Sequence, residues 1–142
     1  MNASKEELLH YLNTVIAKGN MLEFLEIEFT DVGENFLTAR MPVTSKVHQP
    51  LGILHGGASA ALAESVGSTA SYLFIDATQK QALGIDLQIN HLRSLREGML
   101  YATARLLHKG NTIHLWEIIL SDEEGNTVAH AKLTNLIREL RK

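Results

Sequence analysis

The chain has 142 residues, a hydrophobic fraction of 45%, a charged fraction of 20% and a formal net charge of −3. This size is typical of one domain, so we expect a single domain over residues 1–142, and the absence of a long apolar run or a signal-peptide pattern predicts a cytoplasmic protein that does not enter a membrane. Because cysteine is absent, disulfides, thiolate metal sites and a cysteine nucleophile are excluded, and the slightly acidic charge argues against nucleic-acid binding.

The first forty residues predict a helix followed by two strands. Apolar residues recur at helical spacing between residues 4 and 16, Ser4 and Glu7 have the spacing of a capping box, and Gly19 marks the expected end of the helix. The spacing then becomes that of strands, which we expect over residues 21–30 and 36–42, with a turn at 33–34.

A loop over residues 44–57 leads into a long predicted helix, from Ala58 to about Ile75, in which small side chains dominate. Four more strands are expected over residues 85–89, 100–106, 113–120 and 127–137. Because short turns join these four strands, we expect each to pair antiparallel with the next along the chain. The pattern predicts an α+β fold, a curved antiparallel sheet of about six strands wrapped around one long helix, with a short N-terminal helix. The sheet's edges and uncovered face favour a homo-oligomer.

Glu64 is the candidate catalytic carboxylate. It lies in the middle of the long helix, and its neighbours three and four positions away are Ala60, Ala61, Gly67 and Ser68, none of which is cationic. A carboxylate without a local partner is costly to bury, which favours a chemical role as base or nucleophile. The alternative, that the side chain simply faces solvent, stays open at this point.

Two glycines before the predicted helix are candidate oxyanion donors. Backbone N–H groups at Gly56 and Gly57 would lie at the positive end of the helix dipole, where they can polarise a carbonyl group. Paired glycines are also typical of a tight corner, but His55 before them and Glu64 after them favour a site. At 1.5 Å per residue, Gly56 and Glu64 are about 12 Å apart along the helix, so we expect a second subunit to bring such groups together.

At this point the residues match a known family. The segments QPLGILHGGAS (49–59) and AESVGS (63–68) resemble the hotdog-fold thioesterases of the 1,4-dihydroxy-2-naphthoyl-CoA hydrolase group, and they are similar to Arthrobacter-type 4-hydroxybenzoyl-CoA thioesterases. The resemblance covers nearly all of the chain after about Leu22. Further matching features are Gly84, residues 90–94, residues 107–111 and Trp116.

The resemblance implies an acyl-CoA thioesterase that releases free acid and CoA, and an aromatic acyl group is expected. Glu64 takes the catalytic position as nucleophile or general base, and the Gly56 N–H group polarises the thioester carbonyl across a subunit interface. Gln49, His55 and Ser68 complete the implied catalytic set. The implied substrate and CoA contacts are Gly84, His91, Leu92, Arg93, Ser94, His108, Lys109, Gly110, Asn111, Thr112 and Ile113.

The same resemblance implies no metal, no cofactor beyond the CoA of the substrate, and a homotetramer built from hotdog dimers. The phenylacetyl-CoA thioesterase branch carries aspartate at the carboxylate position, and Glu64 argues against that branch. Two alternatives are a hotdog acyl dehydratase or hydratase and a non-catalytic acyl-CoA-binding module. Four cations have two possible roles: they bind the CoA phosphates, or they are solvated surface charges. They are Arg93, Arg96, Arg105 and Lys109. Trp116 and Tyr72 are expected to be packing residues.

Overall fold

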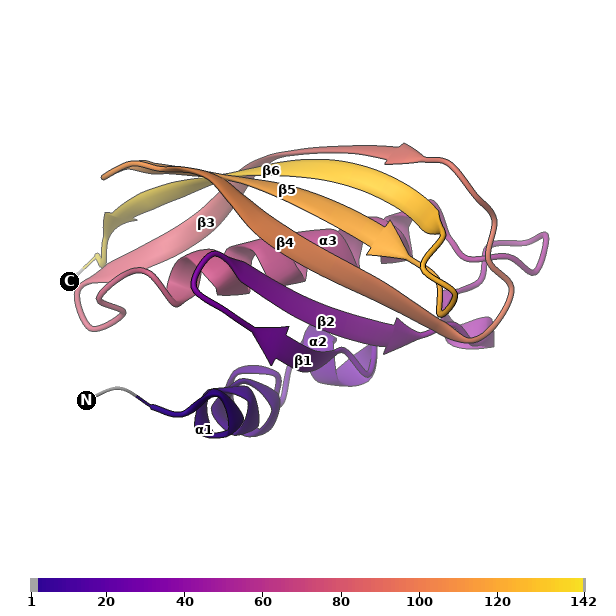
Figure 1. The fold of residues 1–142 in the computed structure, drawn as a ribbon, viewed down its shortest axis with the longest axis horizontal. Coiled ribbons are helices and arrows are strands. Elements are labelled where there is room, and N and C mark those ends of the chain that lie inside the picture. The colour runs from indigo at the N-terminus through magenta and orange to yellow at the C-terminus, as the bar shows by residue number, and fades with distance from the viewer. Residues whose placement is uncertain (1–2, 142) are drawn as a thin grey trace.

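A six-stranded antiparallel sheet curves around one long helix in the computed structural model, which describes residues 3–141 (Figure 1). The expected hotdog architecture is confirmed. The strands are β1 (Glu28–Val32), β2 (Phe36–Pro42), β3 (Lys80–His91), β4 (Met99–Lys109), β5 (Ile113–Ser121) and β6 (Thr127–Glu139). The helices are α1 (Lys5–Tyr11) with a π-helical turn (Leu12–Ile16), α2 (Met21–Phe24), a 3-10 turn (Ser45–Val47) and α3 (Gly56–Tyr72). Among the described residues, no helix has the length and hydropathy needed to cross a lipid bilayer.

The N-terminal segment begins as predicted and then departs from the expectation. Ser4 Oγ accepts the Glu7 N–H at 3.1 Å and Glu7 Oε2 accepts the Ser4 N–H at 2.7 Å, which completes the capping box. The strand expected over residues 21–30 is wrong over residues 21–27 and right only over 28–30, where β1 begins. Asn20 caps α2 there by accepting the Leu22 N–H at 3.0 Å, and this local bond favours a helical turn over an extended chain.

The strand order β1-β2-β4-β5-β6-β3 corrects a second expectation. β4, β5 and β6 pair in chain order as predicted, but β3 pairs with β6 and not with β4. Residues 92–98 form no tight hairpin, because the Leu92 N–H donates to Val128 O at 2.8 Å and the Leu54 N–H donates to Leu95 O at 2.7 Å. The connection therefore crosses the end of the sheet, and β3 becomes an outer edge.

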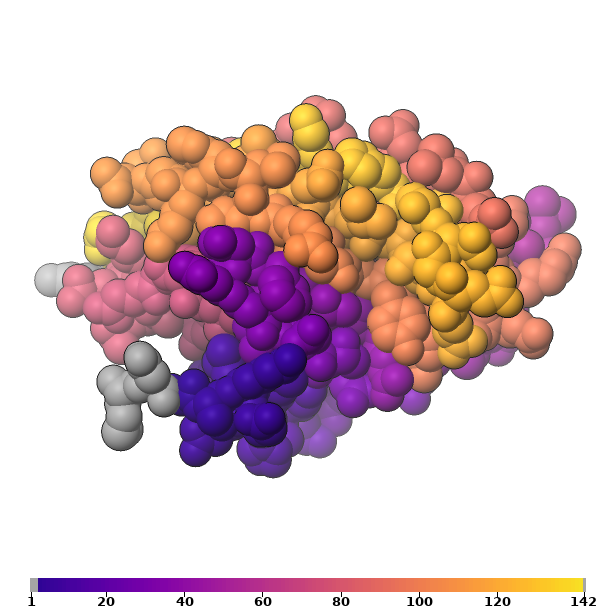
Figure 2. Space-filling view, viewed as in Figure 1, coloured from indigo at the N-terminus to yellow at the C-terminus, as the bar shows by residue number. Residues whose placement is uncertain are grey.

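The two edges of the sheet differ in how they are covered. At β1, the Asn13 side chain donates to Phe29 O at 2.9 Å and accepts the Phe29 N–H at 2.8 Å, and Figure 2 shows the N-terminal helices lying against that side. Within residues 3–141, no strand pairs with the outer side of β3, which leaves Leu83 37% and Ile85 56% exposed. An open apolar edge of this kind is suited to pairing with another chain.

The core fills the space between α3 and the concave face of the sheet. Trp116 on β5 is completely buried and stacks on Phe74, with ring centroids 5.8 Å apart, so it is a packing residue as predicted. Aliphatic side chains from the helix and the strands complete this core, among them Leu62, Val66, Leu100, Ile118 and Leu133.

Buried polar side chains join α3 to β5 and β6. Ser71 Oγ accepts the Trp116 Nε1–H at 2.8 Å and an Asn135 Nδ2–H at 2.7 Å, so its own hydrogen is left to donate to His114 Nδ1 at 3.0 Å. Asn135 Nδ2 also donates to Gly67 O at 3.1 Å. This arrangement requires a neutral His114 ring, and burial lowers the pKa of His114 in the same direction.

Candidate active site

Among the described residues 3–141, one backbone N–H group in the first turn of α3 has no acceptor. α3 begins at Gly56 and not at Ala58, so both glycines belong to the helix, which corrects the expected boundary. His55 is the N-cap, and its Nδ1 accepts the Gly57 N–H at 2.7 Å. In the part of the chain that the structure describes, no acceptor bonds the Gly56 N–H. This donor therefore stays available to a ligand at the positive end of the helix dipole.

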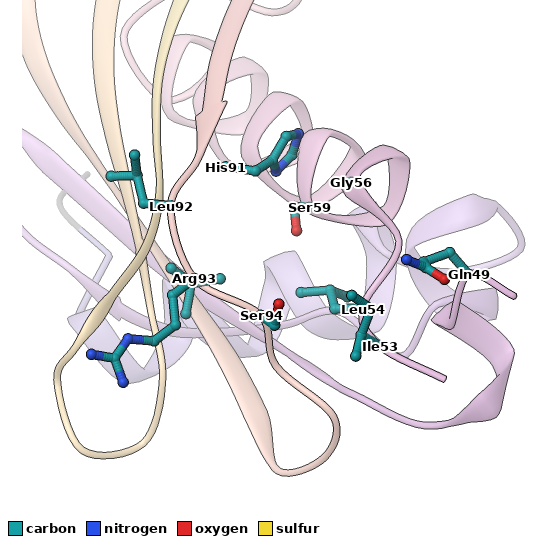
Figure 3. A pocket seen from close by; sticks show the side chains of 10 residues that line it. Gln49, Ile53, Leu54, Gly56, Ser59, His91, Leu92, Arg93 and Ser94 are labelled. Carbon is teal, nitrogen blue, oxygen red and sulfur yellow. The ribbon is translucent and has the colours of Figure 1, made fainter. Parts of the chain in front are cut away.

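A cavity of about 320 Å³ opens beside this N–H group (Figure 3). We call it the Gly56 cavity. It brings together six residues that were predicted from the sequence to form the site: Gln49, Gly56, His91, Leu92, Arg93 and Ser94. Four residues that the sequence did not single out complete the lining: Ile53, Leu54, Ser59 and Val128. Ser59 is buried, and the sequence signal for it was its place at the end of the matching segment 49–59.

The His91 ring lies directly against the start of α3. A Cβ atom on Gly56 would lie 2.9 Å from His91 Nε2, so glycine is needed for this close approach. Gln49 Oε1 accepts the Leu51 N–H, which leaves the amide nitrogen of Gln49 as a donor. Figure 3 shows the Arg93 guanidinium pointing away from Gly56 and from the other labelled side chains, and its charge is near enough to Asp122 to add to the backbone hydrogen bonds that lower the pKa of that carboxyl.

Glu64 lies in a second concavity of about 400 Å³ on the outer face of α3. We call it the Glu64 groove, and its lining residues are Met21, Gly57, Ala60, Ala61, Glu64 and Ser65. Within one protomer Glu64 is exposed, and among residues 3–141 it forms no ion pair or hydrogen bond. In the isolated chain the Glu64 side chain therefore faces solvent, which was the alternative left open by the sequence. Ser68, half-buried, follows one turn later on the helix.

The Glu64 carboxylate lies over β3, at the open edge of the sheet. A Cβ atom on Gly84 would lie 2.5 Å from Glu64 Oε1, so the absence of a side chain at Gly84 makes room for the carboxylate. The pairing of β3 with β6 shifts by one residue between Gly84 and Asp86, a bulge that interrupts the strand at this point. Gly84, expected to contact substrate, thus touches the candidate catalytic carboxylate itself.

One chain does not bring all the expected CoA contacts together. Residues 108–113 lie at the end of the sheet where Ile113 pairs with Leu136, whereas the Gly56 cavity lies at Val128 of the same strand β6. Eight strand residues separate these positions, a distance of about 27 Å at 3.4 Å per residue. Lys109 Nζ lies 4.8 Å above the Phe74 ring. Within a single protomer the two segments therefore do not form one site.

Comparison with known proteins gives one consistent family. The model of the thioesterase superfamily matches residues 51–129. The chain is 43% identical over 129 residues to the 1,4-dihydroxy-2-naphthoyl-CoA hydrolase of Escherichia coli, covering 91% of this chain and 93% of that protein. It is 40% identical over 119 residues to the proofreading thioesterase EntH of Cronobacter turicensis, covering 84% and 86%.

Solved structures give the same result. Thioesterase HI1161 from Haemophilus influenzae superposes with a TM-score of 0.88 at 33% identity, covering 100% of this chain and 95% of that one. A mutant of thioesterase PA1618 from Pseudomonas aeruginosa gives a TM-score of 0.85 at 41% identity, covering 99% and 97%. The resemblance recognised in the sequence is confirmed by these matches.

Proposed function

Since this chain belongs to the thioesterase superfamily, and is accordingly a thioester hydrolase, we propose that it hydrolyses an aromatic acyl-CoA, with Glu64 of one subunit and the Gly56 N–H group of another acting on one thioester. The observation that carries the proposal is the unpaired Glu64 carboxylate, which lies over Gly84 at the open edge of the sheet. The name of the Escherichia coli relative, which contains a naphthoyl group, supports the aromatic acyl class.

The course of β3 supports a site shared between subunits. This strand contacts α3 at two places, with Gly84 against Glu64 and His91 against Gly56. If a second copy adds its β3 antiparallel to the first, the Gly84 end of one strand faces the His91 end of the other. Glu64 of one chain then approaches Gly56 of its partner. Glu64 and Gly56 of the same chain cannot meet in this way, because they are about 12 Å apart along the helix.

The same pairing supports a CoA site made from two chains. Residues 108–113 lie at the Gly84 end of the sheet, because both Gly84 and His114 pair with Asn135 of β6. In an antiparallel dimer, residues 108–113 of one chain and residues 91–94 of the other therefore lie at the same end of the joined sheet. Arg93 and Lys109 could then both face the phosphates of one CoA molecule.

The proposed chemistry uses few groups. The Gly56 N–H donates to the thioester oxygen and stabilises the negative charge that develops there. In the general-base route, Glu64 takes a proton from water, the oxygen adds to the carbonyl carbon, and the C–S bond then breaks and the proton returns to the CoA thiolate. In the nucleophilic route, Glu64 itself adds to the carbon and the C–S bond breaks, which gives an anhydride and the CoA thiolate; water then cleaves the anhydride to free acid and the Glu64 carboxylate, and a proton from this water goes to the thiolate. Gln49, His55 and Ser68 are proposed to position the thioester and the water.

Replacing Glu64 tests the proposal directly. Glu64→Gln keeps the size of the side chain and should lower kcat by about 10²–10⁴-fold, because a general base or nucleophile is removed. The measurement is release of free CoA, detected with a thiol reagent, over aromatic and aliphatic acyl-CoAs. This readout also separates hydrolysis from hydration or dehydration, which release no thiol. Glu6→Gln on the exposed face of α1 is the matched control. Near-normal turnover by an intact Glu64→Gln oligomer would refute the role.

A mixed-oligomer experiment tests the sharing of the site. Gly56→Pro removes the N–H group at the first helical position, where the backbone tolerates proline, and its Cβ also displaces the His91 ring of the same half-site, so this half-site is disabled as a unit. If each site combines Glu64 from one chain with Gly56 from another, dimers of a Gly56→Pro chain and a Glu64→Gln chain have one intact site. Doubly tagged mixed dimers should then regain about half of the wild-type activity per dimer. No recovery would place both groups in the same chain.

A further inference from the structure

The Glu64 groove differs in chemistry from the Gly56 cavity. Its floor consists of Gly57, Ala60 and Ala61, which present little more than backbone and methyl groups. The Ser65 hydroxyl donates to Ala61 O at 2.6 Å, so its hydrogen is already used inside the helix. Among the lining residues Glu64 is the only charged group and no cation is present. An uncharged, apolar group can occupy this space without losing hydrogen bonds or meeting a counter-charge.

Met21 forms the outer wall of this groove from a different element. It is the first residue of α2 and is 58% exposed. The backbone of α2 is fixed by the Asn20 cap and by Lys46 Nζ, which donates to the backbone oxygen of Phe24 at 2.7 Å. A fixed backbone that carries a flexible thioether can contact flat or branched apolar groups of different shapes.

We propose that the Glu64 groove binds the acyl group, that Met21 is a specificity-determining residue that favours apolar acyl groups large enough to contact it, and that Glu64 disfavours acyl groups with a second carboxylate. This inference rests on the proposed function, because it takes the carbon beside Glu64 as the reacting carbon. The CoA part then extends into the partner's Gly56 cavity and the acyl part into the groove. A carboxylate on the acyl group would lie near Glu64, and the groove's own lining residues include no cation to offset the repulsion.

A pair of acyl groups of equal shape tests the charge selection. Succinyl-CoA and 4-methylpentanoyl-CoA differ in that a carboxylate replaces an isopropyl group. We expect kcat/KM for the 4-methylpentanoyl compound to exceed that for succinyl-CoA by at least about tenfold, as expected where repulsion discriminates between substrates. Equal kcat/KM values, or faster turnover of succinyl-CoA, would overturn the inference.

Substitutions in α2 test the role of Met21. Met21→Ala should lower kcat/KM for benzoyl-CoA relative to acetyl-CoA by about tenfold, because the lost wall contacts a ring and not a methyl group. Phe24→Ala is the matched control, since Phe24 is on the same helix, is 66% exposed and does not line the groove. Its benzoyl-to-acetyl ratio should stay within about twofold of wild type.

Filling the groove gives an independent test. Ala60→Leu places a good helix former on the floor and should also reduce benzoyl-CoA turnover more than acetyl-CoA turnover. If Met21→Ala and Phe24→Ala change the ratio equally, or if Ala60→Leu leaves it unchanged, Met21 and the groove do not select the acyl group. Failure of the proposed function has a different signature, namely no thiol release by wild type or full activity of Glu64→Gln.

Discussion

Gly84→Ala should disable Glu64 without removing it. The added Cβ atom would lie 2.5 Å from Glu64 Oε1, whereas ordinary contacts of this kind begin at 3.4 Å, so the carboxylate must retreat by about 0.9 Å. The outer end of a glutamate can rotate away, and the stability of the fold should therefore change little. A displacement of about 1 Å of a catalytic group can cost about 10²-fold in rate, which corresponds to about 2.7 kcal/mol.

The assay is kcat for CoA release by wild type, Gly84→Ala, Glu64→Asp and the double variant, with unfolding midpoints measured in parallel. Aspartate is shorter by one methylene group, so Glu64→Asp should cost less activity in the Gly84→Ala protein than in wild type. Coupling of at least 1 kcal/mol between the two substitutions is expected for groups in contact. Additive losses, or a fully active Gly84→Ala enzyme, would show that the position of the carboxylate over β3 does not matter for catalysis.

The buried polar cluster gives two further predictions. Ser71→Ala leaves the Trp116 N–H and His114 Nδ1 without partners in the core, and it should lower the free energy of unfolding by about 2–5 kcal/mol in a denaturant titration; a loss below about 1 kcal/mol would contradict the hydrogen-bond network. Burial, and to a lesser degree the charge of Lys109, lower the pKa of His114 in the folded chain, so the unfolded chain binds more protons near pH 6. The contribution of His114 to the free energy of unfolding should therefore be fully present above the unfolded-state pKa of about 6.5. It should be lost as the pH falls toward the lower folded-state pKa, and His114→Gln should flatten this pH dependence relative to wild type. An unchanged slope in that variant would assign the acid sensitivity to other groups.

The parts of the fold that could be predicted are those that depend on neighbours in sequence. The capping box at Ser4, the long helix of small residues and the hairpins β4–β5–β6 all follow from local spacing. The place of β3 could not be predicted, because a seven-residue connection over 92–98 fixes no pairing partner and its bonds go to Val128 and Leu54. The strand expected at residues 21–30 is wrong at its start, where α2 forms, because one capping bond at Asn20 decides between two conformations that a short apolar segment allows.

For the candidate site, the sequence predicted which residues take part better than it predicted where they lie relative to one another. Six of the ten residues that line the Gly56 cavity were identified from the resemblance, and the helical rise already required Gly56 and Glu64 to lie apart. The contact between Glu64 and Gly84 crosses from a helix to the bulged edge strand, and no spacing along the chain indicates it. Met21 was also missed, because it was assigned to a strand and not to the wall of a groove beside α3.

The open edge of β3 links assembly to chemistry in this chain. A hydrolase gains from excluding bulk water around its carboxylate, yet the isolated protomer leaves Glu64 exposed and its sheet edge unpaired. The opposite edge is closed by Asn13, so the openness of β3 is not a general property of this sheet. Because the same strand touches Glu64 at one end and Gly56 at the other through His91, a single pairing event would cover the apolar edge and complete the proposed site. The shared-site proposal requires that the pairing that covers the β3 edge also buries Glu64. A dimer paired through β3 in which Glu64 stayed exposed would therefore contradict the proposal.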